Sequence, residues 1–115
     1  MKERITLTAA ALALAAAAAP AAEPALVIPA DSPALEWGPC PEFFPAGCEI
    51  AVLHGDPAAP NADIFFRVPG DFAIPLHRHT SAERMVLVSG EMTVAYEGQP
   101  PAVIRTGDYA FGPAQ

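Results

Sequence analysis

Two histidines and a glutamate lie close together in the second half of the chain, at His77, His79 and Glu83. In an extended strand, residues two apart point to the same side, so we expect the imidazoles of His77 and His79 side by side, with Arg78 facing away. Glu83 follows His79 by four residues and keeps the same parity if the chain stays extended. The spacing therefore predicts that two imidazoles and one carboxylate converge on one point.

This set of ligands suits a divalent transition metal. Two neutral imidazoles and a carboxylate are borderline-hard donors, for which Fe, Mn, Ni, Cu and Zn are all candidates. A pair of histidines alone is weak evidence, because histidines also occur at surfaces and in hydrogen-bonded cores. The added carboxylate strengthens the case, and we predict one metal ion held by His77, His79 and Glu83.

The elements that must position these ligands are short strands. Runs of β-branched and aromatic residues alternate with turn signals rich in Gly, Pro and Asp, and no stretch after residue 23 keeps a helical period. This pattern predicts an all-β fold, an antiparallel sandwich or barrel of the jelly-roll type. The strands that we expect are Glu49–Leu53, Ile64–Val68, Met85–Val88, Met92–Tyr96 and Ala102–Ile104.

The segment around the histidines resembles the first motif of the cupin superfamily, in particular the small single-domain bacterial cupins of the ChrR-like type. In outline, that motif is Gly, five residues, His-x-His, three or four residues, Glu, six residues, Gly. The chain has Gly70, six residues, His77-Arg78-His79, three residues, Glu83, six residues and Gly90, so the first gap is one residue longer. The resemblance implies a cupin barrel with His77, His79 and Glu83 in the metal-binding places.

A second cupin motif begins near the end of the chain. Its outline is Gly, five residues, Pro-x-Gly, two residues, His; Gly107 and Pro113 fit, but the last residue, Gln115, stands where the second glycine is usual. The resemblance covers about residues 49–115. It implies either a fragment, whose fourth ligand would fall three positions after Gln115, or a domain that has lost this ligand. On both alternatives we expect a barrel, residues 42–115, that lacks its C-terminal strands.

Residues 1–21 have the pattern of a signal peptide. Lys2 and Arg4 precede an apolar run over residues 5–19, and Ala19-Pro20-Ala21 offers the small-x-small pattern for cleavage before Ala22. A membrane anchor is the alternative, but the run is short and mostly alanine. We expect a periplasmic or secreted protein that is free of the membrane after cleavage. Residues 22–41, rich in Pro and Ala, then form an extended arm.

The remainder after cleavage is acidic, with four arginines, twelve acidic residues and a formal charge of −8. This balance argues against nucleic acid as a partner. Cys40 and Cys48 are separated by seven residues, and in an oxidising compartment we expect them to form a disulfide. A cysteine-based metal site is the weaker alternative, because no CxxC motif accompanies them. A homodimer is compatible with the unpaired edge that an incomplete barrel exposes.

Other side chains have ordinary structural interpretations. His54 is expected at a strand end, where Asp56 bonds the backbone of the following turn. Tyr96 and Tyr109 are expected to fill the core, with substrate-orienting hydroxyls as the alternative. We expect three large aromatic residues to cap the open end of the core: Trp37, Phe43 and Phe44. Arg67 and Arg105 are expected to be exposed strand residues, with anchoring of an anionic ligand as the alternative.

The resemblance does not name a reaction, because cupin folds serve oxygenases, isomerases, decarboxylases, binding modules and regulators. A metal-dependent oxygenase or related small-molecule enzyme is one function that it implies, since two histidines and a carboxylate leave coordination positions open. The alternatives are a non-catalytic module that captures a small molecule or a metal, and a degenerate structural remnant. No general base separate from the ligands is identified, so the sequence leaves catalysis undecided.

Overall fold

The structure is a computed structural model that describes residues 10–14 and 22–114. Most of the predicted signal peptide lies outside these residues. Within the described ranges, no helix is long and apolar enough to cross a membrane.

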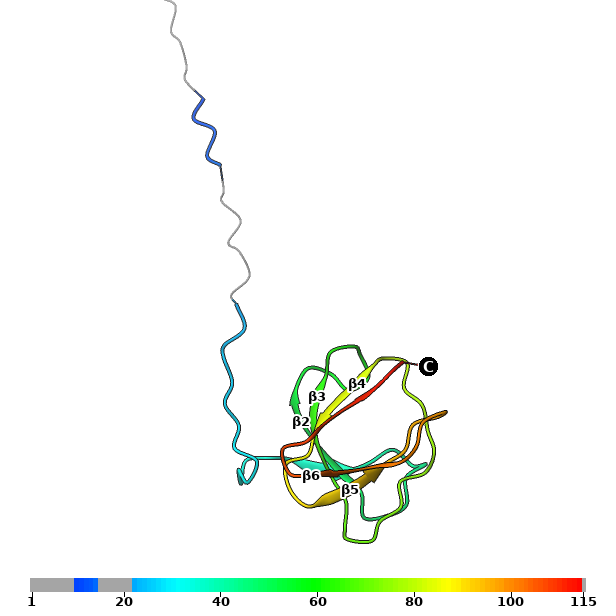
Figure 1. Cartoon of the computed structure of the whole chain (residues 1–115). Coiled ribbons are helices and arrows are strands. Elements are labelled where there is room, and N and C mark those ends of the chain that lie inside the picture. The colour runs from blue at the N-terminus through cyan, green and yellow to red at the C-terminus, as the bar shows by residue number, and fades with distance from the viewer. Residues whose placement is uncertain (1–9, 15–21, 115) are drawn as a thin grey trace, which may run out of the picture.

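The described residues form seven strands and no helix. They are β1 (Trp37–Pro39), β2 (Glu49–His54), β3 (Asp63–Arg67), β4 (Glu83–Val86), β5 (Glu91–Val94), β6 (Ala102–Arg105) and β7 (Tyr109–Gly112). All pairs are antiparallel, and they fall into three sheets, of order β1-β2-β3, β4-β7 and β5-β6. The strands curve around a common interior (Figure 1), but the three sheets are not joined into a closed barrel. The predicted all-β antiparallel fold is confirmed, without barrel closure.

The five predicted strands are all present, with ends shifted by at most two residues. Two further strands were not predicted. β1 forms at the end of the segment that we expected to be an extended arm, and it pairs with β2 from Trp37 opposite Ala51 to Pro39 opposite Glu49. β7 forms from the start of the second cupin motif and pairs with β4. Both are short and carry Gly or Pro, which weakens the strand signal in the sequence.

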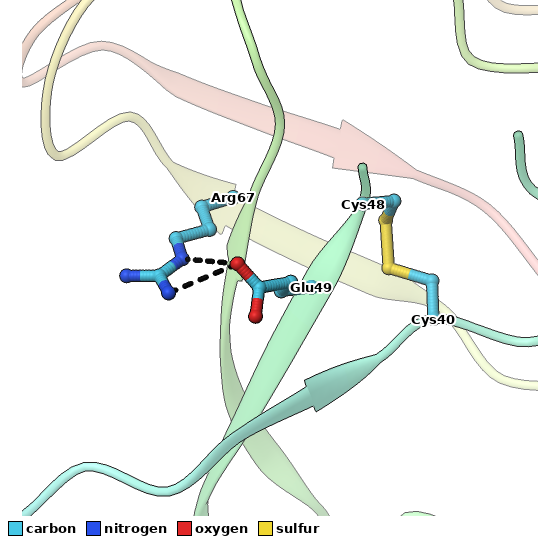
Figure 2. Close-up of a disulfide and its surroundings, with 4 residues drawn as sticks. All are labelled: Cys40, Cys48, Glu49 and Arg67. Carbon is cyan, nitrogen blue, oxygen red and sulfur yellow. Dashed lines mark hydrogen bonds and ion pairs between the residues drawn. A yellow bond between two sulfur atoms is a disulfide. The ribbon is translucent and has the colours of Figure 1, made fainter. Parts of the chain in front are cut away.

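A disulfide between Cys40 and Cys48 confirms the predicted pairing and extends the β1–β2 hairpin. The two Cα atoms are 5.5 Å apart, and the Cys40 N–H donates to the Cys48 carbonyl at 3.2 Å. Figure 2 shows the disulfide near an ion pair that joins the neighbouring strands β2 and β3, in which Arg67 of β3 donates to Glu49 of β2. The bond closes a loop of residues 41–47, and this loop carries two phenylalanines to the site described below.

The core is small and lies between the inward faces of the strands. In β4, β5 and β7 exposed and less exposed residues alternate, as expected for strands with one face inward. The inward residues of β4 and β7 lie opposite each other, with Glu83 across from Gly112 and Met85 across from Ala110. Buried apolar residues among those described are Cys48, Ala51, Ile104 and Ala110. A carboxylate therefore stands in an inward position of β4, where an apolar residue is usual.

Candidate metal site

His77, His79 and Glu83 lie together, as predicted, although the backbone that presents them differs from the prediction. The two histidines were expected in a strand, but residues 73–79 form no strand, and Glu83 is the first residue of β4. Pro75 has no N–H to donate to a neighbouring strand, which helps to explain why the segment joins no sheet. One ligand atom from each of the three residues nevertheless lies within 4.8 Å of the other two.

The three ligand atoms form a chain of close contacts. His77 Nε2 lies 3.1 Å from His79 Nε2, and His79 Nε2 lies 2.8 Å from Glu83 Oε2. The Nε2 of His79 is therefore between two acceptors, the carboxylate and the other imidazole. Without a metal, a proton on Nε2 of His79 is donated to the carboxylate or to the other imidazole. A cation bound among the three atoms replaces that proton, so metal and proton compete for the same place.

A backbone carbonyl fixes the tautomer of His77. Its Nδ1 lies 2.7 Å from the carbonyl oxygen of Pro75, which only accepts, so Nδ1 carries the proton and donates it. In the neutral ring, Nε2 is then left with its lone pair directed toward His79. Metal-binding histidines commonly donate their second nitrogen to a carbonyl or carboxylate in this way. His77 is thus held in the form that binds a metal through Nε2.

The site is open to solvent on the side of the histidines. The His79 side chain is 47% exposed and that of Glu83 is 35% exposed. Two aromatic rings border this opening: the centroids of Phe43 and Phe44 lie 5.9 Å and 5.3 Å from that of His77. Phe44 is in turn 6.0 Å from Phe66 of β3. We expected these phenylalanines to cap the core, and their position at the site was not predicted.

Tyr96 lies on the inner side of Glu83. Its ring packs so closely on β7 that a Cβ added to Gly112 would be 2.8 Å from Cε1 of Tyr96. Burial raises the pKa of Tyr96 above its ordinary value of 10.0, and the negative charge of Glu83 acts in the same direction. The hydroxyl is buried and has no hydrogen-bond partner among the described residues. Tyr96 is therefore a half-buried residue whose buried hydroxyl is unused, which is more than the core filling that we expected.

The other candidates lie away from the three ligands. His54 binds Glu23 at 2.9 Å through Nε2, and Asp56 accepts a hydrogen bond from the Ala58 N–H at 2.8 Å, as expected for a turn aspartate. Tyr109, expected in the core, is 57% exposed because it points outward from β7, so that prediction is wrong.

Both strand arginines have partners on the outer surface. Arg67 donates to Glu49 and stacks over Trp37, with its Cζ 3.7 Å from the ring centroid. Arg105 lies 3.5 Å from Glu91. Neither guanidinium lies at the site, which leaves Trp37 and the two arginines as surface structure.

The family model described as the ChrR cupin-like domain matches residues 27–115. The chain belongs to this family. No curated protein and no solved structure matches the chain at the significance required. The matched region of this ChrR cupin-like domain contains the two histidines, Glu83, the disulfide loop and Tyr96, so every residue described at the site lies within the family domain.

Proposed function

We propose that this ChrR cupin-like domain binds one divalent transition-metal ion through Nε2 of His77, Nε2 of His79 and a carboxylate oxygen of Glu83. The observation that carries the proposal is the convergence of these three atoms within 4.8 Å. The donor set fits Fe, Mn, Ni, Cu or Zn, and the Pro75 carbonyl presets the tautomer of His77 for binding. Three protein ligands leave at least one coordination position for a small molecule or water.

The ion would give the domain a reactive centre at a solvent-accessible place. A bound divalent ion polarises an oxygen-bearing ligand and orients it. The residues of the chain would hold the ion, admit the ligand past the exposed histidines and exclude water with the aromatic rings. A metal-dependent oxygenase or a related small-molecule enzyme uses such a centre, and a non-catalytic module that captures a small molecule uses the same one. We also propose that the chain works outside the cytoplasm, which the Cys40–Cys48 disulfide supports.

The test is metal content after reconstitution with Fe(II), Mn(II), Ni(II) and Zn(II) in turn, measured by elemental analysis. The parent chain should carry one ion, and His77→Ala or His79→Ala should carry none. Glu83→Gln, which keeps the shape of the side chain but removes its charge, should bind more weakly than the parent. His54→Ala is the matched control, because His54 binds Glu23 and not the three ligands, and it should keep its metal.

The pH dependence of metal binding is a second test of the three proposed ligands. Protons compete with the metal for the imidazole nitrogens, so the ion should leave as the pH is lowered and return at neutral pH. If His77→Ala and His79→Ala carry as much metal as the parent, the three residues are not the site.

A further inference from the structure

The Tyr96 hydroxyl is the one buried side-chain polar atom without a partner in the part of the chain that the structure describes. Buried hydroxyls are nearly always hydrogen-bonded, because burial without a partner loses the bonds that water would make. An exception beside a candidate binding site points to a partner that binds from outside. The position of the ring indicates where that partner lies.

The ring of Tyr96 shares the inward face of the β4–β7 sheet with the side chain of Glu83. Gly112 lies directly opposite Glu83 in the antiparallel pair, so a side chain at residue 112 would stand next to that of Glu83. Tyr96 occupies this place instead: its Cε1 and Cζ are 2.8 Å and 3.5 Å from the Cβ position of Gly112. The aromatic ring thus takes the space that a neighbour of Glu83 would fill.

The charges at the site select the kind of ligand. A divalent ion with one carboxylate and two neutral imidazoles keeps a net positive charge, which favours an anionic oxygen as the next ligand. The Tyr96 hydroxyl donates to such an oxygen, and a hydrogen bond to a charged acceptor is stronger than a neutral one. On the open side, the exposed Phe43 and the adjacent Phe44 offer an apolar surface next to His77.

We propose that the site takes small carboxylates with an aromatic or otherwise apolar body, with the Tyr96 hydroxyl donating to a carboxylate oxygen and Phe43 contacting the body. This inference rests on the proposed metal site and adds the class of its ligand. In this assignment Tyr96 is a ligand-binding residue. Gly112, which has no side chain, leaves the space in which the Tyr96 ring lies.

The experiment uses the full chain loaded with Co(II), whose visible absorption reports ligands that bind to the metal, and titrates it with benzoate and with acetate. The parent should bind benzoate more tightly than acetate. Tyr96→Phe should keep its cobalt and weaken both carboxylates by about tenfold, because the lost hydrogen bond serves the group that they share. Phe43→Ala should weaken benzoate several-fold, to near the affinity of acetate, and leave acetate unchanged.

Tyr109→Phe is the matched control, since Tyr109 points outward from the same strand that Tyr96 packs on, and it should bind both carboxylates like the parent. Equal affinities of Tyr96→Phe and the parent would overturn the inference while leaving the metal site in place. Loss of cobalt from Tyr96→Phe would also overturn it, because the hydroxyl would then support the metal ligands. A parent chain that binds no cobalt refutes the proposed function itself, and this inference with it.

Discussion

Replacing Gly112 by Ala tests the packing on which the inner half of the site depends. An added Cβ would lie 2.8 Å from Cε1 and 3.5 Å from Cζ of Tyr96, closer than carbon atoms approach in packed proteins. The ring must therefore move. Overpacking of this kind costs about 1 to 3 kcal/mol. Gly112 does not have a positive φ, so alanine fits its backbone and recovers about 0.4 to 1 kcal/mol through the unfolded chain. We expect a net loss of about 1.3 kcal/mol from the middle of the two ranges, and of about 2.6 kcal/mol at most.

Urea unfolding measures this loss and tests whether it comes from the contact with the Tyr96 ring. Four proteins are compared: the parent, Gly112→Ala, Tyr96→Ala and the double variant. In the Tyr96→Ala background the new methyl group meets no ring, so Gly112→Ala should cost little there. Gly38→Ala is the matched control, because a Cβ at Gly38 in β1 has no atom within 4 Å, and it should cost no stability, with a gain of up to about 1 kcal/mol through the unfolded chain. Equal losses from Gly112→Ala in both backgrounds would refute the packing argument.

Two further predictions concern the disulfide and the buried tyrosine. Reduction of the Cys40–Cys48 bond should lower the free energy of unfolding by about 2.5 kcal/mol, the value for a loop of this length. Urea unfolding with and without a reductant measures this loss, and an unchanged midpoint would contradict the prediction. Burial raises the pKa of Tyr96 above 10.0, so the folded chain favours the neutral phenol. The contribution of this preference to stability is fully present below pH 10 and is lost as the pH rises through the raised pKa. In a Tyr109→Phe variant, phenolate absorbance should appear above pH 10.0 in the folded metal-free chain and at lower pH in urea; identical midpoints would count against it.

The candidate metal ligands and the all-β fold were predictable because both depend on local patterns. The spacing of His77, His79 and Glu83 and the alternation of strands with Gly and Pro turns are visible in the sequence. The ligands converge although the strand geometry assumed for them is absent, since a short irregular segment also brings His77 and His79 together. The predicted convergence of the three side chains is thus confirmed, but the strand geometry assumed for it is not.

The remaining parts of the site depend on contacts between distant segments. Phe43 and Phe44 reach His77 only because the disulfide loop folds over a segment more than thirty residues further along the chain. Tyr96 lies beside Glu83 only because β7 pairs with β4 and presents a glycine there. No periodicity encodes such contacts, and the same residues read as ordinary core in isolation. A single sequence therefore identified the three candidate metal ligands but not the residues that surround them.

The division of the strands into three separate sheets bears on how the domain opens and closes. Backbone hydrogen bonds join the strands within each of the sheets β1-β2-β3, β4-β7 and β5-β6, and none between the described strands joins one sheet to another. The hydrogen bonds of one sheet can therefore open, and its amides exchange with solvent, while those of the other sheets stay closed. The residues around the candidate site come from two of the sheets and from the connection within the third: Phe66 from the first, Glu83 and Gly112 from the second, and Tyr96 from the segment between β5 and β6. An ion and a ligand bound there would tie these sheets together. Amide hydrogen exchange, which for the free chain should show three rates of opening, should then slow in all three sheets at once.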